Sequence, residues 1–234
     1  MNVPDFFDDK YFGRIGKYYI IYDGIIDQML SENYFFSISH LLESQNELDC
    51  SILLASNLYY KQSLQVLRNF VELLTSQILF CDDSKSFYDW RNGIFRLPRL
   101  RGDGGLLKQM ENKNLISSNL GRDISKLYED LNSYAHSTEG RLIHRGAYKG
   151  DYIGFIFDYE YYRNWCEMFA RVVECGVWLL NAHSEQISKF IKQGVMCSVC
   201  HNNKEFDIKE FEFANQKHLE LTCKTCKNKI TIKK

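Results

Sequence analysis

The chain has 234 residues, 45% of them hydrophobic, and a formal net charge of −1. This length holds one domain of ordinary size and a small second one, and the apolar content excludes a chain that is disordered throughout. The near-zero charge also excludes a polycation that binds nucleic acid through net charge alone, although residues 195–234 are modestly basic.

No basic segment followed by an apolar one opens the sequence, and no run reaches the roughly eighteen apolar residues of a membrane helix. We therefore expect a cytoplasmic protein with no signal peptide and no membrane partner. Four cysteines stand singly in apolar helical patterns, where cysteine usually serves as a small core residue: Cys50, Cys81, Cys166 and Cys175. Their scatter favours a reducing compartment over a disulfide framework.

Four long stretches carry apolar residues at helical intervals. The spacing predicts helices over residues 16–42, 47–80, 123–135 and 159–182. The second of these is expected to be the longest, and a bend between Tyr59 and Gln62 is the alternative to an unbroken helix.

Shorter elements connect these helices. Ser84 is expected to cap a short helix, and residues 91–105 form a basic loop that ends before a helical turn at Leu106. Residues 137–154 are rich in glycine and predict a loop with a short extended piece. A last short helix is expected to begin at Ser184.

About five or six helices, two of them long, indicate a mainly α fold, a helical bundle over residues 1–193. The four principal helices are expected to pack antiparallel. After Gly194 the pattern changes, and residues 194–234 are expected to form a small separate β domain.

The second domain contains two C-x-x-C motifs separated by a stretch long enough for a pair of strands. Each motif supplies two thiolates from one turn, and zinc prefers four soft ligands in a tetrahedron. A redox role for a single C-x-x-C, or a histidine ligand such as His201 or His218, is the weaker alternative. We expect one structural zinc ion without an open coordination position, held by Cys197, Cys200, Cys223 and Cys226.

Alternating polar and apolar residues predict strands at residues 210–213, 218–221 and 230–232 around these cysteines. The pattern resembles the zinc-ribbon class of small domains. Its C-terminal end is basic, which is compatible either with phosphate contact or with a solvated tail, and the lysines concerned are Lys224, Lys227, Lys229, Lys233 and Lys234.

Two polar clusters in the helical part are candidates for a functional site. Arg68 and Glu72 are four residues apart in a strongly apolar stretch, and they form either an ion pair on the helix edge or a charged pair that faces a cleft. Tyr128, Asn132 and His136 share one face of a later helix, and His136 ends that helix, where the helix dipole favours a protonated imidazole. More polar residues follow in the loop: Arg141, His144 and Arg145.

The pattern L-R-x-x-x-E at residues 67–72, followed by L-Y-x-x-L-x-x-Y-x-H-S at residues 127–137, resembles that of HEPN-like helical proteins. The resemblance covers roughly residues 15–185. It implies a bacterial toxin or anti-phage protein, a homodimer formed through the helical domain, and the metal-independent ribonuclease activity of the best-known members.

The chain departs from the family's nuclease motif, which is Arg, four to six residues, then His. Counting back from His136, the three permitted positions hold Leu131, Asp130 and Glu129. An arginine for the phosphorane charge must therefore come from elsewhere, and Arg68 is the candidate, while His136 would serve as acid or base. No P-loop, G-x-S-x-G or H-E-x-x-H motif offers another chemistry.

Two functions follow from these residues. The first is an RNA-cleaving effector in which Glu72 and Asn132 orient Arg68 and His136. In this hypothesis the remaining basic residues hold the RNA: Arg91, Arg96, Arg99, Arg101, Arg141, His144 and Arg145. The second is a non-catalytic module that binds nucleic acid or a partner protein. In this hypothesis Arg68, Glu72 and His136 form a buried polar network.

Overall fold

The computed structural model describes most of the helical part and the strands of the C-terminal part. The described residues are 10–30, 39–135, 147–148, 151–152, 157, 159–187, 199, 206–213 and 216–233. Within this part, none of the helices has both the length and the apolar character that crossing a membrane requires.

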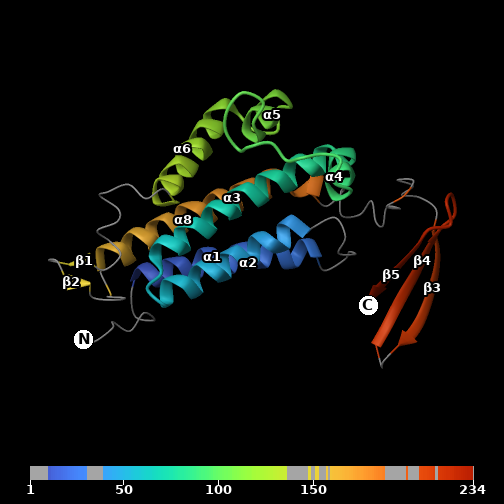
Figure 1. The fold of residues 1–234 in the computed structure, drawn as a ribbon, viewed down its shortest axis with the longest axis horizontal. Coiled ribbons are helices and arrows are strands. Elements are labelled where there is room, and N and C mark those ends of the chain that lie inside the picture. Colours follow the sequence, from blue (N-terminus) through green and yellow to red (C-terminus); the bar gives the residue numbers. More distant parts are fainter. Residues whose placement is uncertain are drawn as a thin grey trace.

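The protein is mainly α, with a helical bundle followed by a small three-strand antiparallel sheet (Figure 1). The helices are α1 (Lys10–Leu30), α2 (Ser39–Ser56), α3 (Tyr60–Asp82), α4 (Ser84–Arg91), α5 (Leu106–Asn112), α6 (Ser118–Ala135) and α8 (Tyr159–Ala182). The strands are β1 (Ala147–Tyr148), β2 (Asp151–Tyr152), β3 (Phe206–Phe213), β4 (Gln216–Cys223) and β5 (Lys229–Lys233). The predicted fold class is confirmed at this level.

The second predicted helix is two helices, α2 and α3, packed as an antiparallel hairpin. The chain reverses at Leu58, whose φ of 65° lies in the left-handed region. The Tyr59 N–H donates to the Leu54 carbonyl at 2.8 Å, which closes the turn. The Ser51 hydroxyl then bridges the pair by donating to the Ser63 carbonyl at 3.1 Å. Of the two alternatives for this stretch, the unbroken helix is wrong, and the bend between Tyr59 and Gln62 lies next to the place where the chain turns back.

Other boundaries shift as well. α1 begins at Lys10, earlier than predicted, and ends at Leu30, while Ser39 to Leu42 belong to α2. α6 starts at Ser118, and α8 has the predicted bounds. The short helix α4 is capped by Asp83 instead of Ser84, because the Asp83 carboxylate accepts from the Ser86 N–H and hydroxyl.

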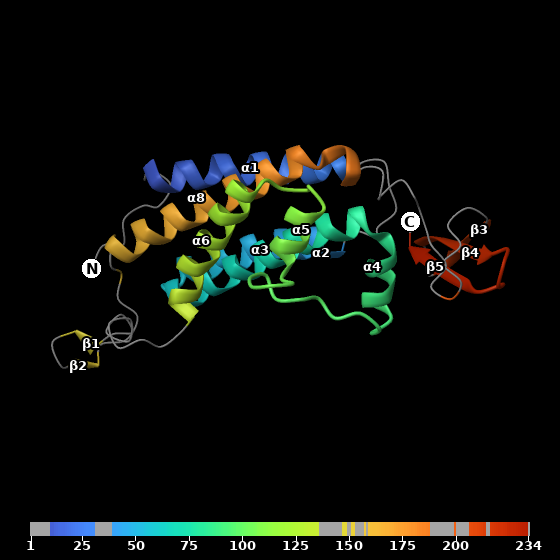
Figure 2. The same ribbon diagram turned by 90° about the horizontal axis from the view of Figure 1, so that it is seen from above.

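The core lies where α1, α3 and α8 meet, and Figure 2 shows α1 and α8 side by side. The rings of Tyr22 and Phe70 pack 5.2 Å apart, and both side chains are buried. Gly176 of α8 lies against them: a Cβ at this position would be only 2.6 Å from the Phe70 ring. The absence of a side chain at Gly176 therefore permits the close approach of these helices.

Some residues of the predicted apolar stripes face solvent. Ile20 is 70% exposed and Leu53 is 65% exposed, whereas Ile15 and Ile26 of α1 are buried. The predicted periodicity identified the helices, but it did not assign each apolar residue to the inner face.

The C-terminal sheet has the strand order β3-β4-β5, with both neighbouring pairs antiparallel. The predicted strands lie inside the observed ones, which are longer. In the register Phe206 pairs with Cys223, and Leu221 pairs with Ile230. Leu221 and Cys223 are buried, so one face of β4 is covered at the end where the second C-x-x-C motif begins.

Candidate functional site

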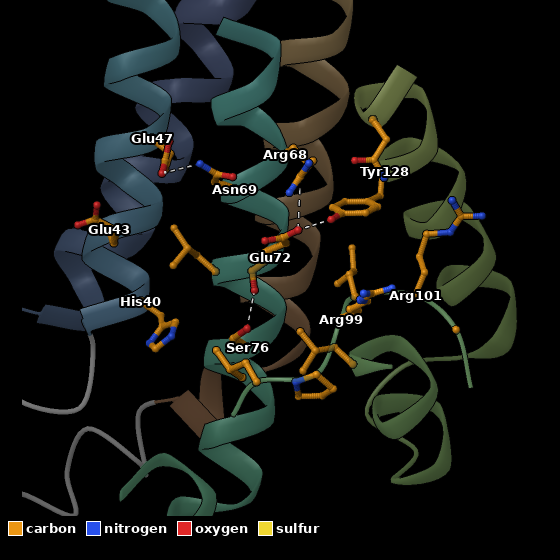
Figure 3. Close-up of a pocket in the computed structure, with 17 residues that line it drawn as sticks. His40, Glu43, Glu47, Arg68, Asn69, Glu72, Ser76, Arg99, Arg101 and Tyr128 are labelled. Carbon is orange, nitrogen blue, oxygen red and sulfur yellow. Dashed lines mark hydrogen bonds and ion pairs between the residues drawn. The ribbon is translucent and has the colours of Figure 1, made fainter. Parts of the chain in front are cut away.

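A groove of about 1090 Å³ opens beside α3 in the helical bundle (Figure 3). α3 forms its floor, α2 lies on one side, and α6 and the loop before α5 lie on the other. Polar side chains from all four segments line it, so residues far apart in sequence meet at one solvent-accessible surface.

Three side chains make a polar network between the floor and the α6 side of the groove. The Arg68 Nε atom lies 3.5 Å from the Glu72 Oε1 atom, and the Tyr128 hydroxyl donates a hydrogen bond to the same carboxylate. The Arg68 guanidinium also lies over the Tyr128 ring, 5.6 Å from its centre. Burial and the Glu72 carboxylate raise the pKa of Tyr128 to about 12, so this hydroxyl stays a donor at neutral pH.

The network faces the groove. The side chains of Arg68 and Glu72 are 33% and 36% exposed, which places the pair on an open surface instead of in a closed core. The buried Nε atom of Arg68 has no hydrogen-bond partner within the described residues, because its contact with Glu72 is long for a hydrogen bond. Asn132 lines the groove one turn beyond Tyr128 on α6.

The loop before α5 contributes a basic wall. Arg99 and Arg101 line the groove, and Arg101 forms a partly exposed ion pair with Glu129 of α6 at 3.4 Å. Backbone bonds fix this loop, because the N–H groups of Leu106 and Leu107 donate to the carbonyls of Arg99 and Leu100 at 2.9 and 3.1 Å. The two arginines therefore lie on a loop whose backbone is fixed by hydrogen bonds.

The facing wall, on α2, is acidic. Glu43 and Glu47 line it, and the Asn69 amide of α3 donates to Glu47 Oε1 at 3.2 Å. Burial raises the pKa of Glu47, and the charge of Glu43 raises it further. The hydrogen bond from Asn69 opposes this rise. This wall was not predicted from the sequence. The available signal was the spacing of His40, Glu43 and Glu47, which places all three on one face of a helix.

His40 closes one end of the acidic wall. His40 is 4% exposed, and its ring packs 5.2 Å from the ring of Phe80 and 4.4 Å from that of Trp90. Burial lowers the pKa of His40 to about 4. The imidazole is therefore neutral at physiological pH and is part of the packing.

We expect the free energy of unfolding to fall as the pH drops from about 6.5 to about 4, because only the unfolded chain then protonates His40. The loss is at most about 1.4 kcal/mol for each pH unit. Urea unfolding at several pH values measures it, and a His40→Phe variant should show a shallower dependence. Burial also lowers the pKa of His183, but this effect is present in both proteins. The difference between their pH dependences is therefore due to His40. Equal slopes would contradict the assignment.

The structure brings together Arg68, Glu72 and Asn132, the described members of the predicted catalytic set, with Arg99 and Arg101. The other two described residues of the predicted nucleic-acid-binding set, Arg91 and Arg96, are exposed but do not line the groove. Four residues of the predicted catalytic and nucleic-acid-binding sets lie outside the described residues: His136, Arg141, His144 and Arg145.

Half of the predicted zinc site is described. Cys223 ends β4 and is buried, and Cys226 follows in the turn toward β5 and is half-buried. The Lys227 N–H donates to the Cys223 carbonyl at 2.9 Å, and Lys227 has a left-handed φ of 61°. This tight turn suits two thiolates of one knuckle. Cys197 and Cys200 lie outside the described residues, and the described residues alone contain no group of three or more potential metal ligands.

Comparisons with protein-family models, curated proteins and solved structures found no match. The structure thus describes a mainly helical protein with a small C-terminal sheet and a polar groove. The comparisons assign it to no family.

Proposed function

We propose that this protein is an RNA-targeting effector, of the kind used in anti-phage defence, that binds RNA in the groove and cleaves it without a catalytic metal ion. One observation carries the proposal: Arg68 and Asn132, taken from two motifs far apart in sequence, meet Arg99 and Arg101 at one open groove. Three guanidinium groups at such a surface match the spaced negative charges of an RNA backbone.

The chemistry needs a base, an acid and a cation. A base removes the proton of a 2′-hydroxyl, the oxygen attacks the adjacent phosphorus, and the bond to the 5′-oxygen breaks as that oxygen takes up a proton. His136 follows Asn132 by four residues, and an imidazole side chain is suited to accept and donate a proton, so we assign it the proton transfers. Arg68 would stabilise the charge on the phosphoryl oxygens, with Glu72 and Tyr128 orienting the guanidinium.

We propose that the C-terminal sheet is held by one structural zinc ion. Cys223 and Cys226 would supply two thiolates, as their tight turn suits, and Cys197 and Cys200 the other two. Zinc in such a four-thiolate site stabilises a small fold and leaves no position for substrate. The homodimer implied by the HEPN-like resemblance remains part of this proposal.

A specific observation favours the second candidate, a non-catalytic module that binds nucleic acid or protein. Glu72 partly neutralises Arg68, and Tyr128 bonds to the same carboxylate, so the cation already has partners without RNA. A network of this kind also serves simply to fix α3 against α6.

Labelled single-stranded RNA incubated with the purified protein, without added divalent metal, tests the choice. We expect cleavage by the parent, and losses of at least about a hundredfold in the His136→Ala and Arg68→Ala variants. Arg163→Ala is the matched control, because Arg163 is a partly exposed arginine on α8 that does not line the groove. Binding without cleavage would support the non-catalytic module, and equal cleavage by all variants would exclude this site.

A further inference from the structure

The two walls of the groove carry opposite charge, and this limits how RNA can lie in it. Arg99 and Arg101 stand on the loop before α5, whereas Glu43 and Glu47 stand on α2, with the floor of α3 between them (Figure 3). A phosphate beside the carboxylates would be repelled by their negative charge. Burial partly desolvates the Glu47 carboxylate, which strengthens this repulsion. The backbone of a bound strand therefore belongs on the arginine side, which turns its bases toward α2.

The α2 wall presents acceptors to those bases. An ionised carboxylate accepts hydrogen bonds and donates none. Glu47 is half-buried and is held by the Asn69 amide at 3.2 Å on one oxygen, so the direction of the carboxylate is set before a ligand arrives. Glu43 lies one turn away on the same face and adds to the negative potential.

Guanine is the base whose edge fits a fixed carboxylate. Its Watson–Crick edge places two donors side by side, the N1–H and the 2-amino group, opposite the two carboxylate oxygens. Adenine and cytosine offer one amino group beside a ring-nitrogen acceptor, and uracil offers one N–H between two carbonyls. Both arrangements turn at least one acceptor toward the carboxylate, which leaves it unpaired.

We propose that the α2 wall is a base-recognition site that selects guanine in single-stranded RNA through Glu47, with Asn69 as its positioning partner. This inference rests on the proposed function, since it names the substrate class of the same groove. Arg68, Arg99 and Arg101 hold the phosphates irrespective of sequence, so affinity and base preference reside on opposite walls.

Fluorescence anisotropy with labelled uridine octamers tests the proposal, the oligonucleotides being 2′-O-methylated so that they cannot be cleaved. One central position holds guanosine, inosine, adenosine or uridine. We expect the guanosine octamer to bind the parent roughly tenfold more tightly than the others, inosine included, because inosine lacks the 2-amino donor. In Glu47→Gln the preference should fall to about twofold or less, while affinity for the all-uridine octamer is kept.

Glu167→Gln is the matched control, because it removes the same charge from a half-exposed position on α8. Retained guanosine preference in Glu47→Gln, or equal binding of the four octamers by the parent, would overturn the inference and leave RNA binding in place. If the parent binds none of the octamers, or if Arg99→Ala with Arg101→Ala binds them as tightly as the parent does, the proposed function fails and the inference fails with it.

Discussion

Replacing Cys223 with serine is expected to abolish zinc binding and to unfold the sheet β3-β4-β5, while the helical bundle keeps its structure. Cys223 is buried at the end of β4, and the sheet is too small to be stable through its own apolar contacts. In such domains the free energy of metal binding is largely the free energy of folding. Metal analysis should give one zinc per parent chain and none in the variant, and proteolysis should cut the variant within residues 206–233.

The matched control is Cys50→Ser. Cys50 is exposed on α2, so this change removes one thiol without touching the second domain. It should leave both the zinc content and the proteolysis pattern unchanged. A chelator should reproduce the Cys223→Ser pattern in the parent. Zinc retained at one per chain in Cys223→Ser, or a protease-resistant sheet after metal removal, would contradict the four-thiolate site.

Replacing Gly176 with valine is expected to destabilise the protein by about 3 kcal/mol. The new Cβ would lie 2.6 Å from the Phe70 Cζ atom and 3.2 Å from the Tyr22 ring. Neither ring has room to move, since both are buried and Tyr22 is also tied to Ser44 by a hydrogen bond of 2.7 Å. Urea unfolding followed by circular dichroism gives the difference in free energy directly.

Gly24→Val provides the comparison for this experiment. Gly24 lies inside α1, and a Cβ added to it would have no neighbouring side chain within 4 Å, so the same substitution meets open space there. Valine has a slightly better helix propensity than glycine, and we expect a change of less than about 0.5 kcal/mol in either direction. Similar losses at the two positions would mean that packing against Phe70 is not the cause.

Much of the fold was predictable because hydrophobic periodicity reports helices directly. The bounds of α8 were predicted correctly, and the three strands of the sheet were found from their alternation. The suggested bend between Tyr59 and Gln62 lies next to the turn between α2 and α3, but the full reversal of the chain was not predicted because no glycine or proline marks it. The reversal depends on a left-handed Leu58, a conformation that leucine rarely adopts, and the apolar pattern continues across it.

The candidate site was predictable only in part. The sequence pointed to Arg68, Glu72 and Asn132 because the polar residues of each motif are spaced four apart and therefore share one face of a helix. The groove brings these residues together. The acidic wall was missed because Glu43 and Glu47 look like ordinary surface charges in sequence. Their place in the groove comes from the α2–α3 hairpin, which turns that face of α2 toward Arg68, and the hairpin itself was not predicted.

The pairing of α1 with α8 has a consequence for the order in which the protein folds. α2 and α3 contact each other across a short turn, so their hairpin can form early and locally. α1 leaves the ribosome before them but packs mainly against α8, the last long helix of the bundle. Of the helices that the structure describes, the first to be made is thus among the last to be packed in place. A nascent chain that stalls before Tyr159 would expose the apolar face of α1 and should need a chaperone.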